Sequence, residues 1–116
     1  MRLAVFVLAT VLGATVTAQQ VYDAGNGVTL PVVVKEVRPQ YTAAATAAKT
    51  EGKVLLKAVV LSDGRVGDDV EVIESLDPEL DQQAVTALKE WEFKPGMRAG
   101  EPVAVRIFCE LTFTLK

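Results

Sequence analysis

The stretch LKEWEFKPG, residues 88–96, changes from one periodicity to another within a few positions. Before it, apolar residues recur from Leu80 to Trp91 at spacings of four, four and three, which is the period of an amphipathic helix. Trp91 and Phe93 are two positions apart, as side chains on one face of a strand are, and Pro95 cannot continue a helix. We therefore predict that Trp91 is structural and closes the buried stripe of a helix, and that Phe93 begins an extended exit.

The predicted helix has a well-defined beginning. Asp77 is a strong N-cap residue, and Pro78 stands at the first helical position, where a missing N–H costs nothing. Glu79 and Asp81 place negative charge in the first turn, which the helix dipole favours. These residues predict a helix that begins at residue 78.

Three strands are expected around this helix. Residues 53–62 (KVLLKAVVLS) are largely apolar on both faces, which is typical of a central strand. Asp63-Gly64 indicates a hairpin turn, after which residues 66–73 form the returning strand. Residues 102–116 (PVAVRIFCELTFTLK) alternate between apolar and polar positions, which predicts a long strand with Cys109 on its core face.

A short helix is expected before the strands. The alanine-rich residues 42–49 are helix-prone, with Thr42 as the N-cap, and Gly52 ends the helical run. The order helix, strand, strand, helix, strand predicts an α+β fold: a three-stranded antiparallel sheet with two helices packed on one face. Residues 19–38 are interpreted as an extended lead-in that lies along the domain.

The N-terminal residues have the order of a secretory signal peptide. Arg2 supplies a positive charge, residues 3–12 are almost continuously apolar, and small residues lead to Ala18, after which we expect cleavage. An uncleaved inner-membrane anchor is the alternative, although the apolar run is shorter than the roughly 20 residues that a spanning helix needs. The predicted division is a signal peptide at 1–18, a lead-in at 19–38 and a domain at 39–116.

The composition of the chain argues against several classes of function. The chain has 116 residues, enough for one small domain, and its net charge of −3 without a basic patch argues against nucleic-acid binding. Histidine is absent, which removes the commonest general base and metal ligand. Cys109 is the only cysteine, so no internal disulfide can form; a buried small hydrophobe is favoured over a reactive thiol.

No catalytic or metal-binding constellation stands out. The acidic run at residues 62–71 resembles a calcium loop only faintly, because two of the three ligand positions before Gly64 are hydrophobic. Glu51, Asp63 and Glu74 are not paired at a defined spacing, and there is no nucleophile motif or phosphate loop. We therefore expect no enzyme, no cofactor, no metal and no small-molecule substrate.

An ordered set of motif residues runs through most of the chain. They are Pro39, Tyr41, Ala45, Glu51, Gly52, Val54, Asp63, Gly64, Ser75, Leu80, Asp81, Ala84, Trp91, Phe93 and Pro95. Together they resemble the TonB C-terminal domain family from about Val32 onwards, with departures at Thr42, Lys49 and Ala58, where the family usually has proline, glycine and phenylalanine.

The resemblance implies a periplasmic protein-binding domain that captures an extended segment, typically the TonB box of an outer-membrane receptor, by strand addition. The expected edge is the final strand, whose outward side chains are Arg106, Phe108, Glu110 and Thr112. Three alternatives stay open: Arg106 and Glu110 could guard a sticky edge against aggregation, the edge could pair with a second copy in a homodimer, or the chain could be a membrane-anchored energy transducer.

A second candidate surface is the sheet face away from the helices. Leu55, Val59 and Leu61 would lie there, and an exposed apolar face usually marks an interface. The alternative is that residues 28–34 of the lead-in cover this face.

Overall fold

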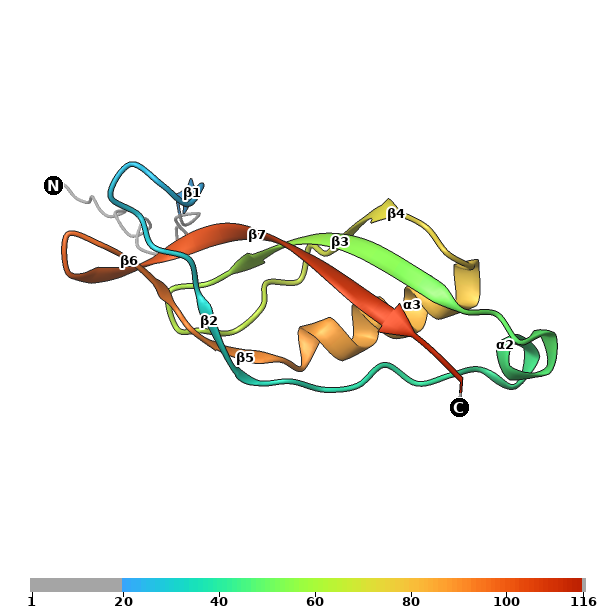
Figure 1. Ribbon diagram of the computed structural model, residues 1–116. Coiled ribbons are helices and arrows are strands. Elements are labelled where there is room, and N and C mark those ends of the chain that lie inside the picture. The colour runs from blue at the N-terminus through green and yellow to red at the C-terminus, as the bar shows by residue number, and fades with distance from the viewer. Residues whose placement is uncertain (1–19, 116) are drawn as a thin grey trace, which may run out of the picture.

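The computed structural model describes residues 20–115, so the expected signal peptide lies outside the described residues. Within them, α3 lies against one side of the sheet and α2 lies beyond its end (Figure 1). The elements, in chain order, are β1 (Val21–Tyr22), β2 (Val32–Lys35), α2 (Ala43–Ala48), β3 (Gly52–Val60), β4 (Glu71–Glu74), α3 (Pro78–Lys89), β5 (Glu92–Lys94), β6 (Gly96–Arg98) and β7 (Glu101–Phe113).

The main sheet is mixed, which corrects the prediction of three antiparallel strands. It has five strands in the order β1-β7-β3-β4, with β6 also paired to β7. The long ladder between β3 and β7 is antiparallel and uses every residue of β3, from Gly52 opposite Phe113 to Val60 opposite Val105. β1 pairs with β7 in parallel, through Val21 opposite Ala104. The predicted β3–β4 pairing is present, but it is interrupted by a register shift.

The lead-in supplies the strands that the sequence did not predict. β1 joins the main sheet, and β2 pairs with β5 in a separate two-stranded antiparallel sheet. Both pairings connect segments far apart in the chain, so no local sequence pattern predicts that these segments pair. Residues 28–34 of the lead-in are held by backbone pairing: Val28 bridges to Arg98, and β2 pairs with β5. Leu55, Val59 and Leu61 on the outward face of the sheet are partly buried.

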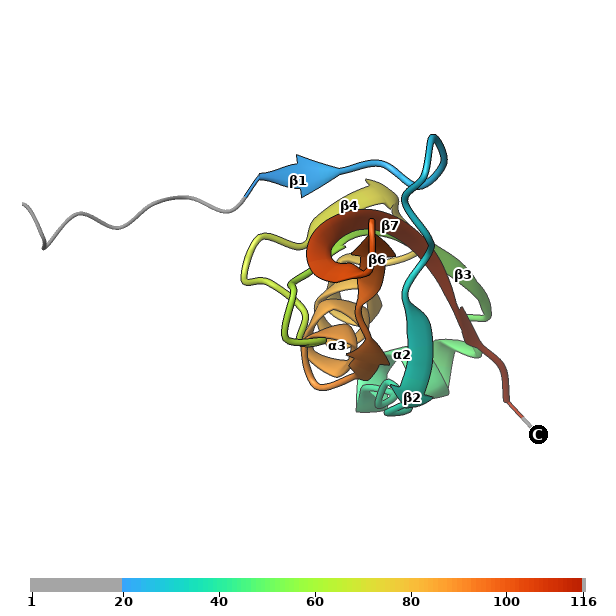
Figure 2. The ribbon, with the colours of Figure 1, turned by 90° about the vertical axis from the view of Figure 1, so that its left-hand side faces the viewer.

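Helix α3 begins where the sequence predicts and contributes several buried side chains to the core. The Asp77 carboxylate accepts hydrogen bonds from the backbone N–H groups of Glu79 (3.1 Å) and Leu80 (3.0 Å). The helix lies on one side of the sheet in both ribbon views (Figures 1 and 2). The buried helix and strand residues are Leu80, Ala84, Ala87, Leu88, Val54, Leu56, Ala58 and Val60.

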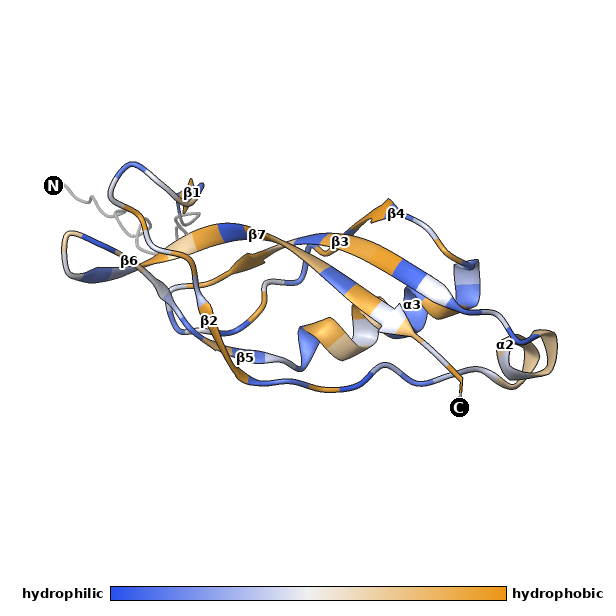
Figure 3. Cartoon of the chain, in the orientation of Figure 1, coloured by the Kyte–Doolittle hydropathy of each residue, from blue (hydrophilic) through white to orange (hydrophobic). Residues whose placement is uncertain are grey.

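From residue 105 onwards, the buried face of β7 is the one that the alternation predicts. Figure 3 shows hydrophilic positions interrupting an otherwise largely hydrophobic strand. Its core face consists of Val105, Ile107, Leu111 and Phe113, all buried. Cys109 lies on the same face but is only partly buried, where it packs against the core. Burial raises the pKa of the Cys109 thiol, which keeps it protonated and favours the packing interpretation over a reactive one.

Candidate functional site

The two edges of β7 are used very differently. The edge that faces β3 is paired along residues 105–113. The other, here called the outer edge, is paired by β1 only at Ala104 and Val105. Within residues 20–115, no strand pairs with the outer edge from residue 106 to residue 113, here called the free edge. Unpaired N–H and C=O groups along such an edge are a template for another extended chain.

The four side chains predicted to select a partner lie on the outward face of this strand. Phe108 is 61% exposed, and Thr112 is exposed next to it on the same face. Glu110 lies 3.7 Å from the ammonium of Lys53 on β3, at positions open to water. The structure therefore places the four predicted residues on one face. Two of the polar ones, Glu110 and Arg106, already form ion pairs within the chain.

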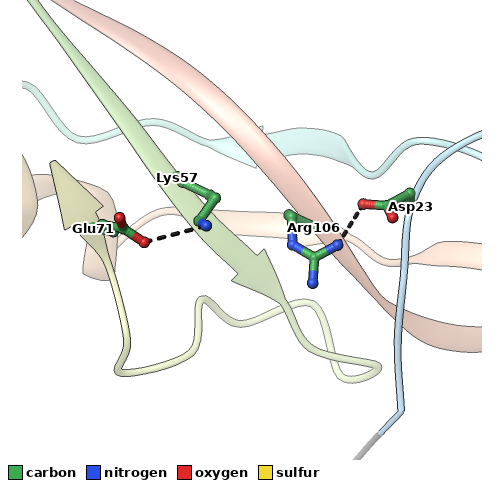
Figure 4. Close-up of polar contacts among 4 residues, drawn as sticks. All are labelled: Asp23, Lys57, Glu71 and Arg106. Atoms are coloured by element: carbon green, nitrogen blue, oxygen red, sulfur yellow. Dashed lines mark hydrogen bonds and ion pairs between the residues drawn. The ribbon is translucent and has the colours of Figure 1, made fainter. Parts of the chain in front are cut away.

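Arg106 has a partner that sequence reasoning missed. Its guanidinium lies 2.5 Å from a carboxylate oxygen of Asp23, the residue after β1 (Figure 4). On the same face, Lys57 pairs with Glu71 across β3 and β4 at 3.2 Å (Figure 4). Such exposed ion pairs contribute little to stability, about 0–1 kcal/mol each. Asp23 had no local pattern to mark it, because it meets Arg106 only in the folded chain.

A groove runs beside the free edge. It has a volume of about 300 Å³, between the end of β7 and the extended residues that follow β2, and a second hollow of about 170 Å³ continues it towards Tyr41. Within residues 20–115, no ion pair engages Glu36 or Arg38 on the groove's far wall. The groove is lined by Glu36, Arg38, Pro39, Trp91, Glu110, Leu111, Thr112 and Thr114.

Motif residues near the end of β7 hold this strand in place. The Tyr41 hydroxyl donates to the Thr50 carbonyl at 2.7 Å, and its ring meets Phe113 edge-on at 5.4 Å. The backbone N–H of Leu115 donates to the Glu51 carboxylate at 2.7 Å. Desolvation, together with the nearby Glu51 charge, raises the pKa of Tyr41. Gly52 begins β3 opposite Phe113. Together these contacts hold the C-terminal end of β7 on the side away from the free edge.

The Asp63-Gly64 turn is present and is fixed to β5, but the strand that follows it differs from the prediction: β4 spans Glu71–Glu74, not residues 66–73, and only an isolated bridge joins Val60 and Val66. The Asp63 carboxylate accepts from the Arg65 N–H at 2.9 Å, and Gly64 adopts a φ of +90°. A Cβ at Gly64 would lie 2.1 Å from the Phe93 carbonyl oxygen, and the Phe93 N–H donates to the Gly64 carbonyl at 2.9 Å. Pro95 lies beside the same glycine, so this turn requires glycine for both conformation and space.

Trp91 lies in the core, in keeping with its predicted structural role. It is 9% exposed, its ring lies 6.0 Å from that of Phe93, and its indole N–H donates to the Val37 carbonyl at 2.8 Å. That hydrogen bond fixes the segment that forms the far wall of the groove. The sequence identified Trp91 but could not reveal this second contact.

Asp81 also serves the fold. Its carboxylate accepts from the Ser75 hydroxyl and from the backbone N–H groups of Leu76 (2.9 Å) and Asp77 (3.3 Å). Burial alone would raise the pKa of this carboxyl, but the three hydrogen bonds together hold it below its ordinary value. The pair of motif residues Ser75 and Asp81 thus ties the end of β4 to the start of α3.

A larger groove lies elsewhere on the described surface. A groove of about 740 Å³ lies between β2, the Asp63-Gly64 turn and the end of α3, and its lining mixes both signs of charge. No group of histidine, cysteine, aspartate or glutamate in residues 20–115 could hold a metal ion. The same residues contain no helix long and apolar enough to cross a membrane.

Comparison with known proteins decides the family. The family described as "Gram-negative bacterial TonB protein C-terminal" matches residues 37–115, more than half of the chain. The chain belongs to the TonB C-terminal domain family. This family is not enzymatic, in agreement with the prediction from the sequence.

Curated relatives and a solved structure agree with this assignment. The chain is 29% identical over 107 residues to Protein TonB of Escherichia coli (strain K12), covering 91% of this chain and 44% of that protein. It is 32% identical over 85 residues to Protein TonB of Vibrio cholerae serotype O1, covering 73% of this chain and 35% of that protein. The chain thus spans less than half the length of these relatives.

The fold is similar to that in the solution NMR structure of the Pseudomonas aeruginosa TonB CTD, with a TM-score of 0.61. The two chains are 24% identical, and the similarity covers 86% of this chain and 97% of the other. At this identity, the likeness supports the fold alone.

Proposed function

We propose that this chain is a periplasmic TonB-type module that captures an extended segment of a partner protein by adding it as a strand to the free edge of β7. The partner class is an outer-membrane TonB-dependent receptor, and the role is in energy-coupled transport. One observation carries the proposal: residues 106–113 form an unpaired edge beside an open groove, in a chain of this family.

The groove suits an extended segment. Its walls are the backbone of β7 on one side and the residues after β2 on the other, so a strand placed there would meet backbone groups and side chains. Phe108 offers apolar contact on the outward face, and Arg38 and Glu36 offer charges that no ion pair engages within residues 20–115. Backbone pairing supplies affinity, and these side chains supply a modest selectivity.

Export to the periplasm is part of this proposal. Residues 1–18 have the order of a signal peptide, so the exported protein should begin at or near Gln19. N-terminal sequencing of the protein from a periplasmic fraction tests this. Recovery of a chain that begins at Met1 in the inner-membrane fraction would favour the anchored transducer instead.

The binding proposal is tested with an extended synthetic peptide of alternating Thr and Val, made in two N-methylated forms. Each form carries methyl groups on every second backbone amide, and the two forms are offset by one residue. Only the form whose methyl groups face β7 should lose binding, by about tenfold or more, because it loses ladder hydrogen bonds. Equal loss in both forms, or no binding by the unmodified peptide, contradicts strand addition.

The protein side of the same test uses Phe108→Pro, which removes one backbone donor from β7. If that N–H faces outward, peptide binding or self-association falls while the domain stays folded; if it faces β3, the domain itself loses stability. A molar mass that rises with protein concentration would identify a second copy as the occupant of the edge. A monomer that binds no extended peptide would refute the proposal.

A further inference from the structure

The lead-in reaches the same edge of β7 that the partner is proposed to use. Residues 20–29, here called the arm, begin with β1, which runs parallel to β7 opposite Ala104 and Val105. β1 therefore occupies the first positions of the outer edge, directly before the free edge. A partner strand that used the whole outer edge would meet this occupant first.

The arm also engages a side chain predicted to select the partner. Asp23 pairs with Arg106 at 2.5 Å, at the point where the free edge begins (Figure 4). One residue earlier, the Tyr22 ring lies 5.2 Å from the guanidinium carbon of Arg98, in a cation–π contact. The arm thus combines backbone pairing and an ion pair with β7 and an aromatic contact with β6.

The chain then turns away from β7 abruptly. Gly25, Asn26 and Gly27 all have positive φ values, of +103°, +52° and +89°. A Cβ at either glycine would meet nothing within 4 Å, so the backbone conformation, and not crowding, accounts for these glycines. The pairing of β1 ends at Tyr22, just before this turn, and the free edge is left open.

The contacts of the arm are weak ones. β1 has two residues, both partly exposed, and the Asp23 side chain is 76% exposed. Short edge strands with exposed hydrogen bonds open at low free energy. Because the arm is tethered, its effective concentration at the edge is nevertheless high, and it competes with any ligand for that site.

We propose that residues 21–23 are an internal stand-in for the partner: a tethered strand that occupies the start of the outer edge and is displaced when a longer partner strand binds. The proposal rests on the proposed function of the edge. It specifies the partner chemistry as an extended segment that runs parallel to β7 and carries a carboxylate to replace Asp23 at Arg106. The arm lowers the apparent affinity of the partner, because the intrinsic affinity is multiplied by the fraction of molecules in which the arm is already displaced.

The test uses two synthetic peptides. The long peptide carries the arm sequence Gln-Val-Tyr-Asp followed by alternating Thr and Val, and the short peptide carries the alternating part alone. Binding is measured to the full exported chain and to Asp23→Asn, Tyr22→Gly and the matched control Asp69→Asn. Asp69 is exposed in the loop before β4 and has the same charge to lose. Thermal unfolding of all four proteins checks that each is folded.

The long peptide should bind Asp23→Asn and Tyr22→Gly about threefold or more tightly than it binds the wild type and Asp69→Asn. The short peptide should bind all four proteins alike. In the wild type, binding of the long peptide should also remove the protection of the Tyr22 amide from hydrogen exchange.

Equal binding of the long peptide to all four proteins, with Tyr22 still protected, would overturn the inference and make β1 a fixed end of the site. In that case the proposed function stands if the short peptide binds. If neither peptide binds any of the proteins, both the proposed function and the stand-in are wrong.

Discussion

Two sides of β7 can be compared: the inner side, which is its core face together with the edge paired with β3, and the outer side, which is its outward face together with the outer edge. On the inner side, Ile107 and Phe113 are buried against the core, and β3 pairs with the whole length of residues 105–113. On the outer side, Phe108 is exposed, and β1 reaches the edge at two residues only. Stability therefore resides on the inner side, which leaves the outer side free to change its partner without loss of the fold.

The largest effect on stability is expected at Trp91, which is buried in the core. Trp91→Ala should lower the free energy of unfolding by about 3–5 kcal/mol, because it empties a buried site and leaves the Val37 carbonyl without its donor. Chemical denaturation measures this. A mutant that unfolds like the wild type would show that the core lies elsewhere.

A smaller loss is expected at Asp81, which supports the inner side from the start of α3. Asp81→Asn should cost about 1.5–3 kcal/mol at pH 7, since hydrogen bonds to a charged acceptor are replaced by weaker ones. Asp77→Asn is a matched control, because asparagine is an equally good N-cap.

The stabilisation contributed by Asp81 is expected to depend on pH. The folded pKa of Asp81 lies below its unfolded value, so the stability it contributes is fully present above the unfolded pKa of about 4. That contribution disappears as the pH falls through the folded pKa. The difference between wild type and Asp81→Asn, measured by urea unfolding, should therefore be constant from pH 7 to 5 and shrink in acid. A difference that grew in acid would contradict the assignment.

A gain is expected at Lys49, where the family usually has glycine. Lys49 ends α2 with φ +57° and ψ +39°, a left-handed conformation that is strained for any residue with a side chain. Lys49→Gly should stabilise the domain by about 0.5–1 kcal/mol, whereas Ala47→Gly, inside the same helix, should destabilise it by about 1 kcal/mol. Thermal unfolding of the two variants gives opposite signs if this is correct.

The smallest effect on stability is expected on the outer side. Phe108→Ala removes an aromatic side chain, as Trp91→Ala does, but the ring is 61% exposed, so the free energy of unfolding should change by no more than about 0.5 kcal/mol. Affinity for an extended peptide should fall a few-fold, because a cross-strand aromatic contact is lost. A large loss of stability would remove the distinction between the two sides of β7.

The sequence by itself determined the elements that have a local physical cause. The Asp77 cap and Pro78 begin α3, the alternation along residues 102–116 fixes which face of β7 is buried, and Asp63-Gly64 forms the turn that was predicted. The placement of Trp91 in the core followed from helical spacing alone. The outward positions of Arg106 and Phe108 followed from the same alternation.

Only the tertiary structure decided what occupies the edges. β1 and β2 are too short to show a period, and they pair with segments near the other end of the chain; the Asp23–Arg106 hydrogen bond spans 83 positions and the Trp91–Val37 hydrogen bond 54. A strand pairing depends on which backbone lies alongside, and contacts at such separation leave no pattern in a single sequence. The sequence therefore singled out β7 as the strand proposed to bind a partner, while the fold determined how much of its edge is open.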